Sequence, residues 1–352
     1  MSARRTPYLK DVFPGTEPIG VEAAVGGMDP GRWLVAVSGG RDSMGLLHAL
    51  LTLRRREVAA VATFDHGTGE AARHGVDLVR ATCAAAGVPC HVGRADRRTP
   101  PTEDGWRRAR WRFLAEAADR AAAVPVTAHT RDDQIETVFL RLLRHAGPRG
   151  LAGMDAVAMD PGGIAQRRPA SPRPPVLRPL LEVSRSTLAG YVARHGIGFV
   201  EDPSNASSRF QRNRVRHELL PALERAHPGF ADWCLDLGRR AGAWRAEVDA
   251  VVDGLGVHSP RAGVVAVPVA SVTGLEATAW ESLWPAIAAR AGVVLDRRGI
   301  ARAARWAPGA RAGQRIPVSG GHRIERTAST FVVRRGASVS GTSVWPYDYI
   351  EG

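Results

Sequence analysis

Apolar positions along residues 33–143 alternate between two kinds of spacing. Short apolar runs, typical of buried strands, lie at residues 33–37, 58–64, 91–92 and 124–128. Apolar residues recur at three- and four-residue spacing, as on one face of a helix, at residues 44–51, 76–83, 103–121 and 135–143. Because strand and helix alternate, we predict an α/β fold with a parallel sheet covered by helices on both faces.

The pattern loosens in the second half of the chain. Residues 147–182 are rich in Gly and Pro, and alanine-rich helical stretches follow near 231–252 and 276–306. Apolar alternation at 263–272 and 330–334 predicts strands. We therefore predict a smaller α+β C-terminal domain. The predicted parts are an irregular segment at 1–30, a first domain at 31–222, a second domain at 223–336 and a short tail at 337–352.

The charge balance indicates a polyanionic partner. Lys and Arg number 48 against 35 Asp and Glu, which gives a net charge of +13, and Lys10 is the only lysine. Such an excess is typical of proteins that bind nucleic acid, and guanidinium groups suit bidentate phosphate contacts.

Cysteine usage and hydropathy exclude several classes of protein. The three cysteines form no Cys-x-x-Cys pair, so neither a zinc ribbon nor a disulfide framework is indicated, and a reducing cytoplasm is the simplest setting. No apolar run approaches the roughly 18 residues that a membrane span needs, and the N-terminus does not resemble a secretory signal.

Three polar clusters directly follow predicted strands, at residues 38–43, 65–66 and 129–133. In parallel sheets covered by helices, ligands bind beyond the carboxyl ends of the strands. The shared placement of the clusters therefore predicts a binding site at this edge of the sheet.

The first cluster has the features of a phosphate loop. It reads Ser38-Gly39-Gly40-Arg41-Asp42-Ser43 and lies between a strand and a helix. Glycines allow close approach of an anion, and the helix start offers unpaired N–H groups. Because Asp42 would repel phosphate unless a cation lay between them, it implies Mg²⁺. A Gly-rich turn capped by Ser and Asp is the alternative, and no Walker-type sequence is present.

The second cluster carries His129, Asp132, Asp133 and Glu136. We expect Asp132 to be the N-cap of the helix that follows. Asp132 and Glu136 are four residues apart and face the same side, so they could share a metal or hold an ammonium group. The alternative is that acidic residues simply favour a helix N-terminus.

These motifs resemble those of a known family. The phosphate loop is similar to the SGGxDS loop of the PP-loop ATPases, which adenylylate a substrate oxygen and release pyrophosphate. Residues 128–137 resemble the HHxDDQxET signature of the tRNA(Ile)-lysidine synthetases. Further matches follow in order to GLxGM at 150–154, RPLL at 178–181, EDxSN at 201–205 and RNxxR at 212–216, so the resemblance covers about residues 31–335.

The resemblance implies an activity and its partners. Members activate the first anticodon cytosine of a CAU-anticodon tRNA(Ile) with ATP and then attach free L-lysine, which forms lysidine. It implies ATP at residues 38–43, Mg²⁺ on Asp42 and Glu136, and catalytic roles for Asp42, His129, Asp132, Asp133 and Glu136. The first domain would be the catalytic domain and the second would bind tRNA or substrate. The base that deprotonates lysine stays open between His129 and a carboxylate.

Arginines outside the two clusters are candidates for contacts with tRNA or ATP phosphates. Arg209, Arg212, Asn213 and Arg216 fall at i, i+3, i+4 and i+7 and would line one helical face. A solvated charged face is the alternative reading of that spacing. Arg107 and Arg110 match an arginine-rich helix of the family and join the same set of candidates.

The chain departs from the family pattern in three places. Asp65-His66-Gly67 is followed by Thr68-Gly69 where members often carry DHGLR, and His129 is followed by Thr130 where a second histidine is usual. The stretch after Arg335 is too short for the further C-terminal domain of long members, so we expect the tRNA body to be bound differently. The oligomeric state stays open, with a homodimer among the options.

Two other functions compete with this one. PP-loop tRNA thiolases generally use Cys-x-x-Cys pairs or a persulfide cysteine, and the context of Cys83 and Cys90 does not match them. A non-catalytic tRNA-binding protein would bind RNA without consuming ATP. The intact phosphate loop and second cluster argue against that alternative.

Overall fold

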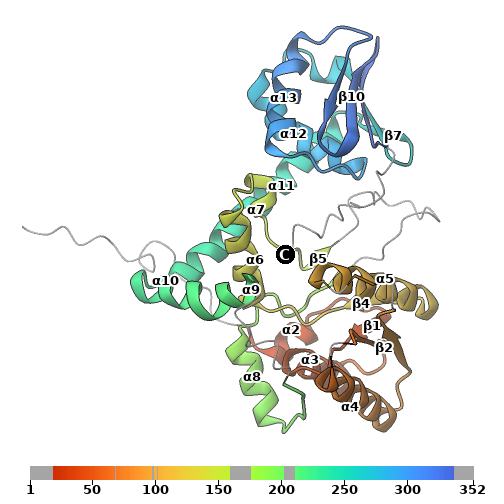
Figure 1. Cartoon of the computed structure of the whole chain (residues 1–352), viewed down its shortest axis with the longest axis vertical. Helices are drawn as coiled ribbons and strands as arrows, with labels where there is room; N and C mark the ends of the chain where they lie inside the picture. Colours follow the sequence, from red (N-terminus) through yellow and green to blue (C-terminus); the bar gives the residue numbers. More distant parts are fainter. Residues whose placement is uncertain are drawn as a thin grey trace, which may run out of the picture.

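The computed structural model describes residues 19–336, except 68, 97–98, 101, 159–175 and 202–210. It holds two sheets, one in each half of the chain (Figure 1). The strands of the first sheet are β1 (Trp33–Ala36), β2 (Val58–Asp65), β3 (Cys90–Arg94), β4 (Val124–Val126), β5 (Val157–Ala158) and β6 (Val176–Leu177). The helices of this half are α2 (Val21–Gly26), α3 (Arg41–Leu53), α4 (Glu70–Ala86), α5 (Glu103–Ala121), α6 (Arg131–Leu143), α7 (Pro148–Leu151) and α8 (Arg185–Arg194).

The first sheet has the strand order β3-β2-β1-β4-β6-β5. All neighbouring pairs are parallel except β5 with β6. The chain leaves β1 toward β2 and β3 and then returns to β4 on the other side of β1, so the order reverses there. Ligands of such sheets bind at this reversal point, beyond the carboxyl ends of the strands. The loops after β1 and β4, which carry both predicted clusters, therefore meet at one edge.

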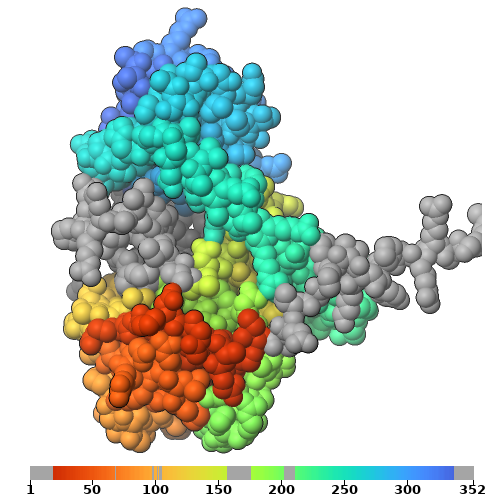
Figure 2. Space-filling model, turned by 180° about the vertical axis from the view of Figure 1, so that it is seen from behind, coloured from red at the N-terminus to blue at the C-terminus, as the bar shows by residue number. Residues whose placement is uncertain are grey.

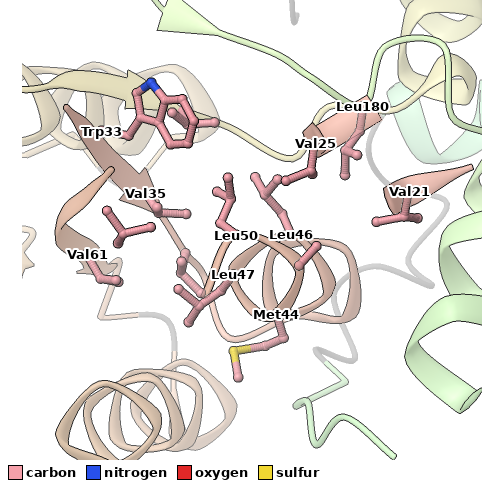
Figure 3. Packing of buried hydrophobic residues seen from close by; sticks show 14 of the residues in the cluster. Val21, Val25, Trp33, Val35, Met44, Leu46, Leu47, Leu50, Val61 and Leu180 are labelled. Carbon is pink, nitrogen blue, oxygen red and sulfur yellow. The ribbon is translucent and has the colours of Figure 1, made fainter. Parts of the chain in front are cut away.

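Helices cover both faces of this sheet. Val35 and Val61 point to the face covered by α3, where they pack with Leu46, Leu47 and Leu50 (Figure 3). The alternate residue Leu34 points to the other face and packs against Leu114 of α5. Opposite orientation of successive side chains is the pleat of a strand buried on both faces. The predicted α/β fold is confirmed.

The second half is an α+β unit. Its sheet has the order β7-β8-β11-β10-β9, is antiparallel throughout, and packs against α12 and α13 around Trp280, Trp284 and Phe331. Its strands are β7 (His258–Arg261), β8 (Val264–Pro268), β9 (Arg315–Val318), β10 (His322–Arg326) and β11 (Thr330–Arg334). Its helices are α12 (Ala277–Arg290) and α13 (Arg297–Trp306), with 3₁₀ turns η3 (Val269–Val272), η4 (Ala307–Gly309) and η5 (Ser319–Gly321).

One long helix joins the two halves. The connecting elements are α9 (Gln211–Arg214), the π-helical turn η2 (Val215–Leu219), α10 (Leu220–Ala226) and α11 (Phe230–Gly254). Helix α11 has 25 residues, a length of about 37 Å. Figure 2 shows it running in teal from the half that holds the first sheet to the C-terminal half. Asp249 of α11 binds Arg149 of α7 at 3.0 Å and Arg290 of α12 at 3.4 Å, so one carboxylate ties both halves to the helix.

Most of the predicted elements are present, and the differences are local. The helical stretch predicted at 276–306 is two helices, because the chain turns at Gly292 with φ +67°. The strand predicted at 263–272 ends at Pro268 and continues as the turn η3. Helix α11 packs against α6 of the first half and also contributes Val252 to the C-terminal core, so its contacts do not mark a single division of the chain. The domain boundary predicted at 222/223 stays a prediction. The tail at 337–352 lies outside the described residues, as does most of the segment at 1–30. Within the described part of the chain, no helix is long and apolar enough to cross a membrane.

Candidate active site

The phosphate loop connects β1 to α3 and leaves the start of α3 uncapped. Gly40 is the N-cap residue. Because it has no side chain, no side-chain cap accepts a hydrogen bond from the first N–H groups of the helix. Ser43 Oγ donates to Gly40 O at 2.9 Å and accepts from Ser38 N at 3.1 Å, which folds the loop back on itself. A compact loop beside uncapped helical N–H groups is suited to bind phosphate, and this role of the loop stays a prediction.

A second glycine allows the loop to adopt this shape. Gly39 has φ +84°, and a Cβ atom built there would lie 2.5 Å from the Cα of Gly75 in α4. A Cβ atom on Gly75 would in turn lie 2.8 Å from Ser38 O. Val200 N also donates to Gly39 O at 2.9 Å. The backbone of α4 and that of residue 200 therefore both contact the loop, and the place of Gly75 in an ordinary helical pattern did not reveal its part in this packing.

We expect Gly75→Ala to weaken ATP binding by about tenfold or more while the protein stays folded. The added methyl group must displace the loop, since a contact of 2.8 Å with a backbone oxygen cannot be relieved by a side-chain rotation. Binding of ATP measured by calorimetry checks this. Gly190→Ala in α8, where an added Cβ would meet nothing within 4 Å, is the matched control and should bind ATP normally.

The helix after β4 begins differently from the prediction. Thr130, not Asp132, is the N-cap of α6: its Oγ1 accepts from Asp133 N, while Asp133 Oδ2 accepts from Thr130 N at 2.8 Å. This reciprocal capping box occupies Asp133 and leaves the Asp132 side chain to accept from Arg185 N at 2.7 Å. The prediction that Asp132 caps α6 was wrong, because its carboxylate serves the start of α8.

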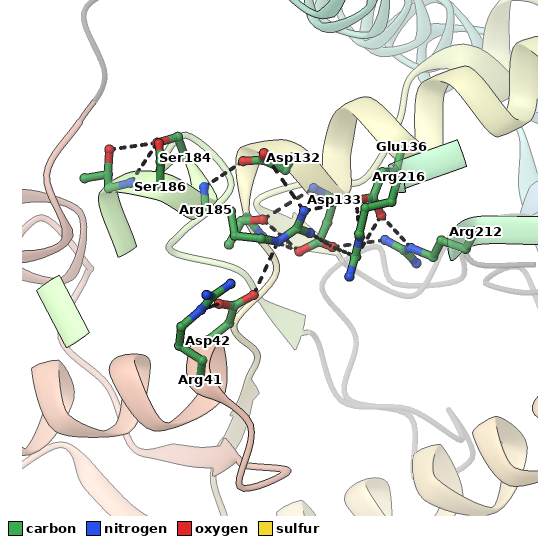
Figure 4. Close-up of polar contacts among 12 residues, drawn as sticks. Arg41, Asp42, Asp132, Asp133, Glu136, Ser184, Arg185, Ser186, Arg212 and Arg216 are labelled. Atoms are coloured by element: carbon green, nitrogen blue, oxygen red, sulfur yellow. Dashed lines mark hydrogen bonds and ion pairs between the residues drawn. The ribbon is translucent and has the colours of Figure 1, made fainter. Parts of the chain in front are cut away.

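The carboxylates of α6 are surrounded by guanidinium groups (Figure 4). Glu136 is almost fully buried and accepts from Arg216 Nε at 2.7 Å, from Arg212 Nε at 2.9 Å and from Arg185 NH1 at 3.2 Å. Asp133 Oδ1 accepts from the same three arginines, at 2.9 to 3.3 Å. Asp132 and Glu136 were predicted to share a metal or hold an ammonium group. The cationic groups that contact Glu136 are guanidinium groups of the chain itself, and a metal ion there stays a prediction.

The arginines keep the buried carboxylates charged. Burial alone would raise the pKa of Asp133, but Arg212 and Arg185 outweigh it and lower that pKa to about 2. Burial also opposes the charge of Glu136, and its pKa is nevertheless lowered by the hydrogen bond from Arg216 and by Arg212. Both groups are therefore anionic at neutral pH.

The negative charge of Asp42 is compensated less by neighbouring cations than the charges of Asp133 and Glu136. Burial raises its pKa, Arg185 at 3.6 Å opposes this, and Asp133 raises the pKa again. Arg41 lies 3.4 Å away but is itself more than a third exposed. Asp42 is half-buried, and a carboxylate whose charge is disfavoured is a group that a bound cation would stabilise.

Arg185 is the functional candidate that the sequence interpretation missed. It contacts carboxylates from both clusters, yet it lies about 50 residues from α6 and more than 140 from the phosphate loop. The sequence feature that could have indicated Arg185 is its position: it begins a helix four residues after the RPLL element and follows the N-cap Ser184. A single arginine among 48 basic residues does not stand out on that evidence.

Comparisons with known proteins identify the domain that holds this site. Residues 19–223 match a family model described as a PP-loop domain. A tRNA(Ile)-lysidine synthase from Salinispora arenicola is 40% identical over 245 residues, which cover 67% of this chain and 70% of that protein. The chain belongs to the tRNA(Ile)-lysidine synthase family. Relatives of the same name from Salinispora tropica and Pseudomonas aeruginosa are 42% and 40% identical, over 56% and 55% of this chain.

The matched part covers 58% of the S. tropica synthase and 42% of the P. aeruginosa synthase. Among solved structures, the U34-tRNA thiolase NcsA from Methanococcus maripaludis has a TM-score of 0.50 at 11% identity, and the match covers 63% of this chain and 78% of that one. At this identity the likeness shows a shared fold.

Two synthase motifs outside the site have structural roles. Gln134 of α6 donates to Met154 O at 2.9 Å and accepts from Met154 N at 2.7 Å, and Gly153 has φ +66° beside it. The end of this motif, after α7, is thus a turn held to α6 through Met154. Arg178 of the RPLL element is buried and donates to Asp155 O at 2.9 Å.

The remaining predicted site residues lie on several different elements. His129 is half-buried after β4, with its Nδ1 2.8 Å from Thr127 Oγ1. Arg107 is buried and Arg110 half-buried on α5, which covers the face of the sheet opposite α3. Asn213 lies on α9, and Arg209 is outside the described residues. Their contacts with RNA or ATP stay predictions.

Proposed function

We propose that this chain ligates free L-lysine to C2 of the first anticodon cytidine of a CAU-anticodon tRNA(Ile). ATP would be cleaved to AMP and pyrophosphate, and the product, lysidine, would change the tRNA from methionine to isoleucine specificity. The supporting observation is the meeting of the phosphate loop and the acidic face of α6 at one sheet edge, in a lysidine synthase family member. We place the reaction in the cytoplasm, where all its substrates occur.

The first step would activate the base. The cytosine carbonyl oxygen attacks the α-phosphorus of ATP and forms a new O–P bond. The bond between the α-phosphorus and the oxygen of the leaving group breaks, and pyrophosphate departs. The uncapped N–H groups of α3 and the hydroxyl group of Ser38 would bind the phosphates, and Ser43 would join them by exchanging its bond to Gly40 O for one to phosphate. Because the N–H groups are held before the substrate arrives, they stabilise developing charge without reorganising.

The second step would transfer lysine. Its ε-amine attacks C2, a C–N bond forms, and the cytosine oxygen leaves with AMP. The amine must lose a proton, and His129 and the α6 carboxylates are the candidates for the base. Asp132, with an exposed side-chain fraction of 39%, is the most accessible of these carboxylates and suits first contact with a cationic amine.

The residues present fit a magnesium ion at Asp42. A hard carboxylate oxygen with a disfavoured charge lies beside the phosphate loop, and Mg²⁺ typically takes one or two carboxylates together with substrate phosphates. When bound, the ion would offset the charge that develops on pyrophosphate. For Glu136 to serve as a second ligand, Arg212 or Arg216 would have to release one of its oxygens, and this role stays a proposal.

Incubation with ATP, Mg²⁺, labelled lysine and a CAU-anticodon tRNA(Ile) tests the proposed function. Label should enter the tRNA only when ATP is present, and a tRNA whose first anticodon base is uridine should stay unlabelled. If the folded protein transfers no lysine, the proposal is wrong. Transfer of sulfur instead would favour a thiolase, and tRNA binding without ATP cleavage would favour a non-catalytic binding protein.

The C-terminal half carries much of the positive charge that tRNA binding requires. Residues 256–336 contain 12 arginines and four acidic residues. Arg298, Arg302 and Arg305 fall at i, i+4 and i+7 on α13 and are exposed. Reversing all three to Glu is expected to weaken tRNA binding about tenfold or more and to reduce its salt dependence by about one unit of slope per lost phosphate contact.

Filter binding over a range of salt concentrations measures this effect. The matched control reverses Arg32, Arg56 and Arg120, which are exposed near the amino ends of the parallel strands, opposite the site. The control makes the same change in net charge and should retain most of the affinity. Equal losses in both variants would show that only net charge matters and that α13 is no contact surface.

A further inference from the structure

Arg185 lies where the phosphate loop meets the acidic face of α6. Its NH2 donates to Asp133 Oδ1 at 2.9 Å, and its NH1 donates to Glu136 Oε1 at 3.2 Å. Its Nε lies 3.6 Å from Asp42 Oδ2 on α3 (Figure 4). One guanidinium group therefore connects carboxylates from two helices that follow different strands.

The position of this guanidinium is fixed through the backbone. Arg185 N donates to Asp132 Oδ2 at 2.7 Å, and Arg131 N donates to Val183 O at 2.9 Å. The first turn of α8 is thus attached to the first turn of α6, and the side chain of Arg185 is only 17% exposed. A rigid attachment of this kind suits a group that sets the geometry of its neighbours.

One donor of Arg185 faces a carboxylate but makes no hydrogen bond. Its Nε is buried and has no hydrogen-bond acceptor among the described residues. A buried donor without a hydrogen bond destabilises the fold, and Asp42 Oδ2 would become its acceptor after a movement of about half an ångström. The donor therefore faces the one carboxylate that belongs to the phosphate loop.

We propose that Arg185 is a positioning residue for the adenylation step; this inference rests on the proposed function. Its guanidinium holds Asp42 beside the α6 carboxylates against their mutual repulsion, so that the ATP side and the acceptor side of the site keep a fixed separation. The planar shape matters because NH1, NH2 and Nε serve Glu136, Asp133 and Asp42 at once. A lysine ammonium is a compact point charge and cannot reach all three.

Arg185→Lys and Arg185→Ala test this role in the full-length protein. We expect kcat for lysine transfer to fall about a hundredfold in both, because small displacements of reacting groups have effects of that size. The KM for tRNA should stay within about twofold, because Arg185 is not proposed to contact tRNA. The dissociation constant for ATP with Mg²⁺ should rise about tenfold, since Asp42 and Asp133 would repel each other and the phosphates.

Arg194→Ala is the matched control. Arg194 ends the same helix, pairs with Glu22 at 2.7 Å, is 62% exposed, and should tolerate the change without loss of kcat. If Arg185→Ala does not fold, the kcat of Arg185→Lys alone tests the proposal. Circular dichroism at the assay temperature checks that the lysine variant is folded. A kcat for Arg185→Lys within threefold of the unchanged protein, or a loss explained by unfolding, would overturn the proposal.

The binding measurement separates this proposal from the proposed function. If the unchanged protein transfers no lysine, the proposed function fails, and the role of Arg185 is then judged by ATP binding alone. Weaker ATP binding by folded Arg185→Lys, with normal binding by Arg194→Ala, would still support the connection between Arg185 and the phosphate loop. Unchanged ATP binding would overturn it.

Discussion

Asp42→Ala is expected to slow pyrophosphate release by about a thousandfold while tRNA binding stays unchanged. The reason is that Asp42 is the carboxylate of the phosphate loop and the proposed ligand of Mg²⁺, so its loss removes charge stabilisation where pyrophosphate leaves. Pyrophosphate release can be followed with a coupled assay, and tRNA binding by filter retention. Turnover near that of the unchanged protein would remove Asp42 from the metal site.

Asp42→Asn separates this catalytic role from stability. The pKa of Asp42 is raised by burial, so its charged form destabilises the folded protein at neutral pH. We therefore expect the asparagine variant to melt at a higher temperature than the unchanged protein at pH 7 and to be inactive. The difference in melting temperature should shrink as the pH falls through the raised pKa, because the unchanged protein then becomes protonated and neutral too. A lower melting temperature at pH 7 would contradict this.

Glu136→Ala is expected to be strongly destabilising as well as inactive. The substitution would deprive Arg185, Arg212 and Arg216 of their shared partner, and breaking a buried ion pair by removing one side costs about 3–5 kcal/mol. For a domain of this size, that lowers the melting temperature by roughly 10 °C. Thermal unfolding followed by circular dichroism measures it.

Glu22→Ala provides the comparison for Glu136→Ala. Glu22 also pairs with an arginine, Arg194, but both side chains are about half exposed or more. Exposed ion pairs contribute about 0–1 kcal/mol, so this variant should melt close to the unchanged protein. Equal melting temperatures for the two variants would show that the arginines around Glu136 do not depend on it.

The sequence predicted the elements whose own apolar pattern specifies them. Helix α5 (Glu103–Ala121) and strand β11 (Thr330–Arg334) have the predicted bounds, because their inward residues repeat at the spacing of each element. Strand β7 was missed because all four of its residues are exposed, and β9 contains Pro317, which is tolerated at the edge of a sheet. Such strands are specified by their neighbours and not by their own hydropathy.

The sequence predicted which carboxylates belong to the candidate site, but not which arginines pair with them. The carboxylates of both clusters follow strands and were found as motifs, whereas the role of Arg185 arises only where α3, α6 and α8 meet. The cap of α6 was a local feature that could have been found: Thr130-x-x-Asp133 has the form of a capping box. Arg212 and Arg216, which were predicted to contact phosphates, donate hydrogen bonds to Glu136, and their contacts with phosphates stay predictions.

The stoichiometry of a single round of reaction distinguishes adenylation of the cytosine from any other use of ATP. The protein is mixed with ATP, Mg²⁺, lysine and a limiting amount of CAU-anticodon tRNA(Ile), and AMP, pyrophosphate and the modified anticodon nucleoside are quantified by mass spectrometry. Equal amounts of AMP, pyrophosphate and lysidine are expected for each tRNA. Formation of ADP and phosphate, or of AMP without lysine on the cytidine, would contradict this expectation.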